Sequence, residues 1–248
     1  ISELGDLIHD VPSARLFDEI LKLLMSGHAW AGIQALQDAG LHHGLLPLID
    51  KALANDSSAQ FIQRALRNTD ERIQSGKSVS PGFLFAALLW PDLELRWRSL
   101  LAGGMPHLPA LHAAIDDTIA QQNAGITIQR RHEGDMRDIW TMQPRFEKRI
   151  GRYPYRLLEV PRFRAGYDFM LLRSQTGSCN ASLGQWWTDF IHADLPEREA
   201  LLAKAKEEDL QSGQVPSNPN KKRRRRSKKP LKEAEKSMDL EMGDGKHE

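Results

Sequence analysis

The sequence has little cysteine and no long hydrophobic run. Cys179 is its only cysteine among 248 residues, so no disulfide can form within the chain, which fits a reducing cytoplasm. The longest purely apolar run, residues 83–90 (FLFAALLW), is far short of the ~20 residues that a membrane span needs. No signal peptide is visible. A chain of this length can bury a sizeable core, so neither disulfides nor a metal are needed for folding.

Net charge is also nearly absent, but its distribution is uneven. The 34 Lys and Arg and 33 Asp and Glu give a formal charge of +1. Residues 221–248 carry 11 basic and 6 acidic residues, whereas residues 1–220 carry 23 basic and 27 acidic ones. The basic run lies at 221–230 (KKRRRRSKKP). The tail is therefore a separate electrostatic unit on a mildly acidic body, a property that the net charge conceals.

Strand-like alternation is missing, and apolar residues recur at three- and four-residue steps almost throughout. This periodicity predicts an all-α fold. Ser80 and Pro81 are expected to begin the most apolar helix, and Pro91 is expected to end it. The Gly- and Pro-rich stretch 102–109 is expected to be a loop. Further helices are predicted at 13–27, 28–40, 58–76, 110–122, 133–152, 183–195 and 196–209.

Three segments follow from this pattern. Residues 1–101 are predicted to form the first helical domain, and residues 102–210 an arginine-rich helical domain. From residue 211 the composition turns to Ser, Gly, Pro and Asn and then to the basic run. Because nothing there could bury enough surface to offset chain entropy, residues 211–248 are predicted to be disordered.

No catalytic constellation is visible in the sequence. There is no phosphate-binding Gly-rich loop, nucleophile elbow or dinucleotide fingerprint. The pairs His9-Asp10, His42-His43 and Asp116-Asp117 lack further ligands at useful spacing, and Cys179 has no candidate base beside it. We therefore predict no catalytic residue, metal site or cofactor site on this chain.

Cations gather on one side of the predicted helix 133–152. With Arg137 at 0°, Arg145, Lys148, Arg149 and Arg152 fall between about 20° and 120° on a helical wheel, and the apolar residues fall between about 180° and 300°. Arg156, Arg162, Arg164 and Arg173 follow, with Tyr153 and Tyr155 among them. Interleaved cations and aromatics suit phosphate contacts and base stacking on single strands. A solvated face paired with Asp138 and Glu147 is the alternative, and Pro144 is expected to kink or restart the helix near Gln143.

The predicted RNA contacts extend into the tail. A dense basic run attracts RNA through counterion release, although a nonspecific solubility segment is the alternative. The bulky cluster of Trp186, Trp187 and Phe190 is expected to be core packing rather than a stacking platform. The tail residues predicted to contact RNA are Lys221, Lys222, Arg223, Arg224, Arg225, Arg226, Lys228 and Lys229.

Three stretches resemble the bacterial poly(A) polymerase I family, which belongs with the CCA-adding enzymes to the class II nucleotidyltransferases. They are residues 11–30 (VPSARLFDEILKLLMSGHAW), 83–90 and 137–174 (RDIWTMQPRFEKRIGRYPYRLLEVPRFRAGYDFMLLRS). The likeness covers roughly residues 1–190. In the motif ARLFDE, Arg15 and Glu19 match an arginine and an acid that brace the neck helices in that family.

The resemblance implies a chain made of the end of a neck, a body and an RNA-gripping C-terminal part. The family's catalytic head, which carries the metal-binding carboxylates, has no counterpart in residues 1–248, and the chain opens within an apparent helix. We therefore expect part of a longer enzyme that uses ATP and Mg²⁺ to add adenylates to single-stranded RNA 3′ ends. RNA-decay proteins are a further partner class for the basic tail. Two alternatives stay open: a stand-alone helical RNA-binding or protein-docking module, and the body of a CCA-adding enzyme.

Overall fold

The computed structural model describes residues 12–40 and 47–211 and contains helices without strands in those ranges, which confirms the all-α prediction. Residues 212–248 of the predicted tail and the pairs His9-Asp10 and His42-His43 lie outside the described residues. Gln211, the first residue of the predicted tail, is instead the last residue of a helix. The chain divides into one compact unit up to residue 208 and a second from residue 209. The helices are α1 (Ser13–Leu24), α2 (Ala29–Asp38), α3 (Pro47–Leu53), α4 (Asp56–Gln74), α5 (Pro81–Ala102), α6 (His107–Asn123), α7 (Arg130–Phe146), α8 (Tyr153–Leu158), α9 (Phe163–Gln175), α10 (Ala181–His192) and α11 (Leu195–Gln211).

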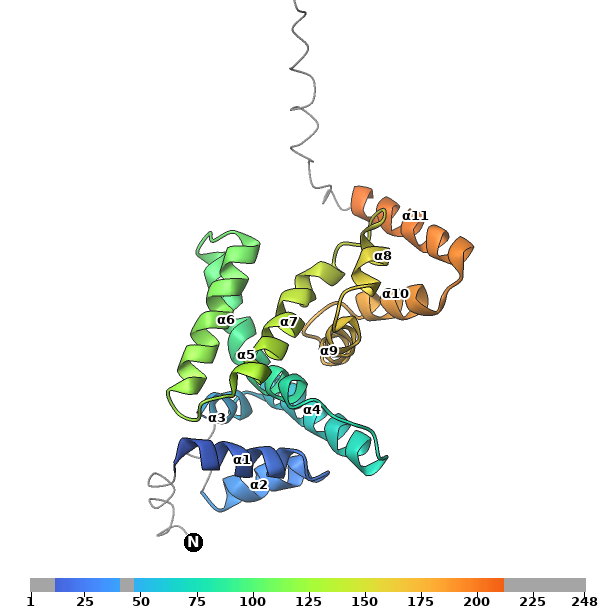
Figure 1. The fold of residues 1–248 in the computed structure, drawn as a ribbon. Helices are drawn as coiled ribbons and strands as arrows, with labels where there is room; N and C mark the ends of the chain where they lie inside the picture. The colour runs from blue at the N-terminus through green and yellow to red at the C-terminus, as the bar shows by residue number, and fades with distance from the viewer. Residues whose placement is uncertain (1–11, 41–46, 212–248) are drawn as a thin grey trace, which may run out of the picture. The chain divides into compact units, whose positions relative to one another are not determined.

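Helix α5 is the centre of the first hydrophobic core. It packs against α4, α6 and α7 (Figure 1), and its residues from Leu84 to Trp90 are buried. The hydroxyl of Ser80 accepts the backbone N–H of Phe83, and Pro81 occupies the first turn, which confirms the predicted start. Such a helix is stabilised mainly by burial, since its apolar residues cover nearly its whole circumference.

The prediction that Pro91 ends this helix is wrong, because α5 continues through Pro91 to Ala102. A proline inside a helix removes one backbone hydrogen bond and costs about 3 kcal/mol. Packing beyond it offsets this cost: Leu93 and Trp97 are buried in the same core. The loop predicted at 102–109 is correspondingly shorter, since α6 begins at His107.

A second hydrophobic core lies around α10. Trp187 and Phe190 are fully buried there, and the Trp187 indole N–H donates to the carbonyl oxygen of Phe146 at 2.9 Å. Helices α7 and α9 supply residues to both cores, so they connect them. Core packing of the Trp186, Trp187 and Phe190 cluster is therefore confirmed. Among the described helices, none is long and apolar enough to cross a lipid bilayer.

Candidate nucleic-acid interface

The predicted basic helix 133–152 is two helices in the structure. Helix α7 ends at Phe146, and α8 begins at Tyr153. Gly151 has φ +56°, a left-handed conformation that interrupts a helix and suits glycine. Pro154 then occupies the first turn of α8. The prediction of a single cationic helical face is therefore wrong, because Lys148, Arg149 and Arg152 lie in the connection between the two helices.

Pro144 does not restart the helix near Gln143, contrary to that part of the prediction. The helix runs through it to Phe146. Gln143 is fully buried, and its side-chain amide donates to the carbonyl oxygens of Ile139 and Gly166 at 2.9 and 3.2 Å. Burial of Phe146 in the second core stabilises the last turn, so tertiary packing outweighs the local effect of proline.

Half of the eight cations predicted outside the tail are paired with carboxylates. Arg137 lies 2.6 Å from Asp116, Arg149 3.4 Å from Glu208, and Arg164 3.0 Å from Asp168. Arg162 contacts Asp135 and lies 3.5 Å from Asp138. Exposed ion pairs such as that of Arg137 with Asp116 contribute about 0–1 kcal/mol, so a phosphate can replace the carboxylate there at little cost. The Arg149 side chain, by contrast, is only 16% exposed.

The other four cations surround α8. Arg152 and Arg156 are exposed, and their side chains make no hydrogen bond or ion pair with any described residue. Arg145 donates from Nε to the Tyr153 hydroxyl at 3.3 Å, and the Lys148 ammonium lies 4.6 Å from the centre of the Tyr153 ring. We call Arg145, Lys148, Arg152 and Arg156 the α8 cation cluster.

The stacking candidates Tyr153 and Tyr155 are half-buried. Tyr155 packs edge-on against Phe190 at 5.2 Å between ring centres, and the Arg198 guanidinium lies 5.9 Å from its ring. Tyr153 is engaged by Arg145 and Lys148. Tyr153 therefore helps to position Arg145 and Lys148, whereas Tyr155 packs against the second core, and base stacking by either ring stays a prediction.

Arg173 was predicted to extend the surface cations, and that prediction is wrong. Its side chain is buried, with the guanidinium 4.5 Å from the Trp90 ring and bonded to Gln143 Oε1 at 3.3 Å. Glu94 lies 3.9 Å away. Burial lowers the pKa of this guanidinium, and nearby Cys179, Glu94 and Glu147 oppose the shift.

The neck-bracing pair predicted from ARLFDE lies on an exposed face of α1. Glu19 pairs with Lys22 of the same helix at 2.8 Å. That hydrogen bond and charge lower the pKa of Glu19, and Arg15 adds a weaker effect of the same sign. A bracing role between helices stays a prediction.

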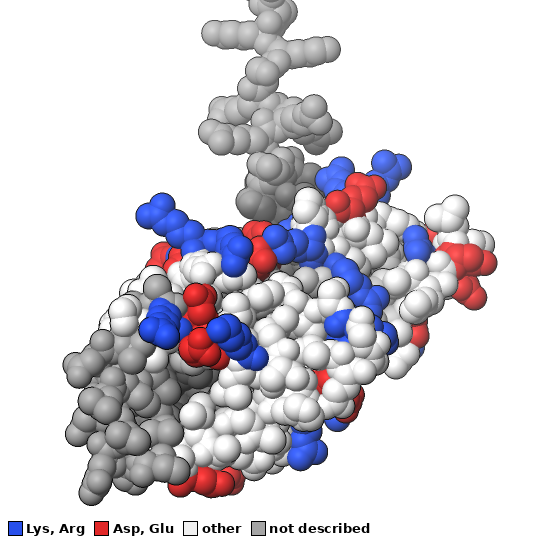
Figure 2. All heavy atoms as spheres, turned by 60° about the horizontal axis from the view of Figure 1, so that its bottom comes forward, with Lys and Arg blue, Asp and Glu red and all other residues white. Residues whose placement is uncertain are grey.

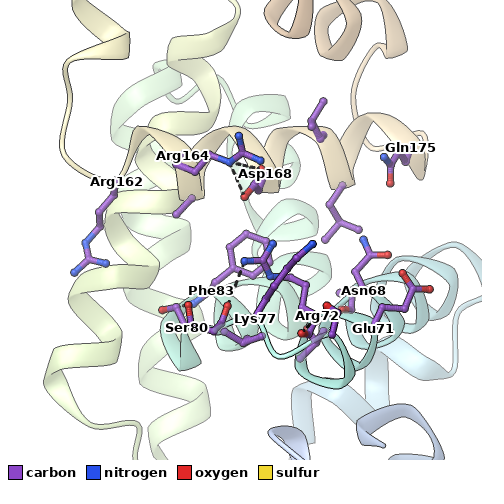
Figure 3. Close-up of a pocket in the computed structure, with 18 residues that line it drawn as sticks. Asn68, Glu71, Arg72, Lys77, Ser80, Phe83, Arg162, Arg164, Asp168 and Gln175 are labelled. Carbon is purple, nitrogen blue, oxygen red and sulfur yellow. Dashed lines mark hydrogen bonds and ion pairs between the residues drawn. The ribbon is translucent and has the colours of Figure 1, made fainter. Parts of the chain in front are cut away.

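A groove of about 770 Å³ lies between α4, the following residues up to Phe83, and α9. Arg72 and Lys77 line one side, and Arg162 and Arg164 line the other (Figure 3). Sequence reasoning found Arg162 and Arg164 but missed Arg72 and Lys77. No local signal marks these two, because α4 is an ordinary amphipathic helix of mixed charge and its neighbour α9 lies about 90 positions later.

One face of the described part is dominated by neutral and basic groups. Figure 2 shows Lys and Arg side chains in a band across the upper part of this face, with acidic groups among them and a mostly neutral surface below. Within the described ranges, no group of three His, Cys, Asp or Glu is placed to hold a metal ion.

Burial raises the pKa of the Cys179 thiol, with Arg173 acting in the opposite direction. A raised thiol pKa disfavours the reactive thiolate.

Comparison with known proteins decides the family. Residues 103–230 match the model described as the polymerase A arginine-rich C-terminus, which is more than half of the chain. The chain belongs to the poly(A) polymerase family. Residues 1–53 match a second model of that family, described as a probable RNA and SrmB binding site of polymerase A.

Curated members of the poly(A) polymerase family match most of the chain. The poly(A) polymerase I of Salmonella typhimurium is 36% identical over 208 residues, which is 82% of this chain and 45% of that protein. The Escherichia coli O6:H1 enzyme is 33% identical over 240 residues, or 94% of this chain and 50% of that protein. The Haemophilus influenzae enzyme is 35% identical over 207 residues. The chain thus spans about half the length of these family members.

Proposed function

We propose that this chain is the RNA-holding part of a polynucleotide adenylyltransferase that adds adenylates to RNA 3′ ends from ATP. Two matches support this function: the relatives are named poly(A) polymerase I, and the model matching residues 1–53 is described as a probable RNA-binding site. The observation that carries it is the set of outward-facing cations around α8 and along the α4–α9 groove. Such cations bind a sugar–phosphate chain of any sequence.

Each group of cations has its own part in this proposal. Arg152 and Arg156, which have no partner among the described residues, bind phosphates directly. Arg137, Arg149, Arg162 and Arg164 exchange a surface carboxylate for a phosphate, which is a stronger acceptor for a guanidinium. The basic run Lys221–Lys229, which lies outside the described residues, raises the association rate and adds nonspecific affinity.

Catalysis in this proposal belongs to the whole enzyme. Transfer of an adenylate from ATP requires Mg²⁺ held by clustered carboxylates, and the described residues offer no such cluster. ATP and Mg²⁺ are therefore assigned to the full-length enzyme, and this chain alone is expected to bind RNA without extending it. We place the enzyme in the cytoplasm and propose RNA-decay proteins as partners of the tail.

Two assays on the purified chain test this function. In the first, a labelled single-stranded 20-nucleotide RNA is titrated with the chain, and we expect binding that weakens steeply between 50 and 200 mM salt. In the second, labelled ATP, Mg²⁺ and the same RNA are added, and we expect no incorporation. Absence of binding at low salt would overturn the RNA-holding role, and incorporation of adenylate would overturn the assignment of catalysis to the rest of the enzyme.

A further inference from the structure

The α4–α9 groove has one wall that neither family model covers. The models match residues 1–53 and 103–230, whereas Arg72, Lys77 and Phe83 lie between these spans. We propose that this groove is a binding site for one or two consecutive nucleotides of single-stranded RNA. The proposal rests on the proposed function and deepens it by naming a site.

Cations face one another across the groove. Figure 3 shows Arg72 and Lys77 on the side of α4 and the segment after it, and Arg164 on α9 opposite them. Arg72 donates from Nη2 to the carbonyl oxygen of Ser78 at 3.2 Å, which holds its guanidinium over the loop between α4 and α5. Glu71 and Asp168 are the acidic residues of the lining. Arg164 pairs with Asp168, and Arg162 pairs with Asp135 and Asp138 outside the lining. Arg72 and Lys77 form no ion pair with a described residue, so these two cations are available to a phosphodiester.

An apolar floor lies between these charges. The half-buried Phe83, together with Ala165 and Leu172, is part of the lining. Phe169 packs against Phe83 with 5.9 Å between ring centres and a 77° angle between planes, so the ring is fixed from within the core. A fixed aromatic ring beside phosphate-binding cations is the usual arrangement for a stacked base of a single strand.

Two side-chain amides lie in the lining without a described partner. The amides of Asn68 on α4 and Gln175 at the end of α9 make no hydrogen bond with any described residue. Amides of this kind bind base edges and ribose hydroxyls. The groove volume of about 770 Å³ lies within the range of small-molecule sites, so it suits one or two nucleotides rather than a duplex.

Arg162 fixes one end of the groove. Its φ of +65° is in the left-handed region, which is uncommon for residues other than glycine. Such a conformation persists where the surroundings hold it, and functional sites are frequent places for it. Here Asp135 and Asp138 of α7 bind the Arg162 guanidinium and hold it at the groove entrance.

Photo-crosslinking tests the location directly. The full chain is irradiated with a 12-nucleotide single-stranded RNA carrying 5-iodouridine, and crosslinked peptides are mapped by mass spectrometry. We expect crosslinks within residues 65–83 or 162–175, and at least about a fivefold loss of them in Phe83→Leu, since removing a stacked base contact weakens binding about 5- to 100-fold. Crosslinks confined to other segments would overturn the proposal.

Charge variants test the phosphate contacts. In Lys77→Ala/Arg164→Ala, the slope of log K against log salt should fall by about 1.4, because each lost phosphate contact on a single strand removes about 0.7. The matched pair Lys204→Ala/Lys206→Ala removes the same charge from two exposed positions of α11, next to Glu207 and Glu208, and should leave the slope unchanged. Thermal unfolding of each variant verifies that it is folded.

The outcomes separate this proposal from the proposed function. If the unaltered chain binds RNA and the two double variants show the same slope of log K against log salt, the groove proposal is wrong and the RNA-holding role stands. If the unaltered chain binds no RNA, the proposed function itself is wrong. Competition of AMP or ATP for the Phe83 crosslink, with an unchanged RNA salt slope in the groove variant, would identify a free-nucleotide site and overturn the RNA assignment.

Discussion

Arg173 is a cation held inside the protein by neutral, aromatic and acidic partners. Its guanidinium lies over Trp90 and bonds to Gln143 and to the carbonyl oxygen of Ser178, with Glu94 at 3.9 Å. These partners connect α5, α7 and α9 and the turn after α9. A buried cation is tolerated only when its hydrogen bonds and countercharge are in place. The role of Arg173 is therefore structural.

Removing this side chain should destabilise the fold without affecting RNA directly. We expect Arg173→Ala to lower the free energy of unfolding by about 2–4 kcal/mol, because it leaves a cavity and buried polar groups without a partner. Arg98→Ala is the matched control, since the exposed Arg98 pairs with the same Glu94 at 3.0 Å and should contribute under about 1 kcal/mol. Chemical denaturation measures the free energy of unfolding of both variants, and equal decreases in the two would contradict the structural role of the buried Arg173.

His132 is buried among aromatic rings of the first core. Phe17 and Phe85 lie 6.1 and 6.4 Å from its ring centre. Burial lowers the pKa of His132, the Arg131 charge adds to this, and Asp135 opposes it. The folded protein therefore favours the neutral imidazole, which also accepts the Arg131 Nε–H at 3.2 Å.

This lowered pKa predicts a loss of stability in acid. As the pH falls through about 6.5, the usual value for histidine, the unfolded chain takes up a proton that the folded chain does not, so the free energy of unfolding decreases. His132→Phe fits the same aromatic surroundings and should show a smaller decrease between pH 7 and 5. Denaturation at several pH values measures this, and parallel curves for the two proteins would contradict it.

Helices α5 and α7 approach each other closely at Gly82. A Cβ added to Gly82, in the first turn of α5, would lie 2.4 Å from Cβ of Asp135 on α7. Neither atom can move without moving its backbone. Gly134 immediately precedes Asp135 on α7 but is exposed, and a Cβ on Gly134 would meet nothing within 4 Å.

The same substitution should therefore have opposite effects at these two glycines. Gly82→Ala should lower the free energy of unfolding by about 1–3 kcal/mol, because overpacking separates α5 from α7. Gly134→Ala should raise it by up to about 1 kcal/mol, since alanine favours a helix interior and restricts the unfolded chain. Thermal unfolding of both variants is the measurement, and a stabilised Gly82→Ala would show that the two helices are not in close contact.

Helix type and approximate position were predictable from the sequence, whereas helix ends at proline were not. The period of the apolar residues predicted an all-helical fold, and Ser80 with Pro81 predicted the start of α5. Pro91 and Pro144 lie inside helices because buried residues on both sides stabilise the continuation, and this packing is absent from any local pattern. The single helix 133–152 was wrong for the opposite reason: α7 ends at Phe146 and a non-helical connection that includes Gly151 follows, although the charge pattern continues through it.

At the scale of the whole molecule, two hydrophobic cores share α7 and α9. The first core extends from α1 to α9, and the second contains parts of α7 to α11. Helix α6 and the first half of α7 lie in the same core as α5, although they fall on the far side of the sequence division at 101/102. The division into domains at that point stays a prediction.

The candidate site could be predicted only in part from the sequence, because segments far apart in the chain form it. Arg162 and Arg164 belong to a basic stretch that composition reveals. Arg72 and Lys77 become part of the site because folding brings α4 against α9. Arg173 is not part of the surface, because the packing of the helices buries its side chain. Membership in a surface depends on contacts between distant segments, which one sequence does not specify locally.

Salt dependence of RNA binding tests the central claim most directly. Arg152→Ala/Arg156→Ala removes two exposed cations from the α8 cation cluster, and Lys204→Ala/Lys206→Ala removes two from α11. The account predicts a slope of log K against log salt reduced by about 1.4 for the first pair and unchanged for the second. Identical slopes for both pairs and the unaltered chain would contradict the claim that the outward-facing cations of the helical scaffold hold RNA.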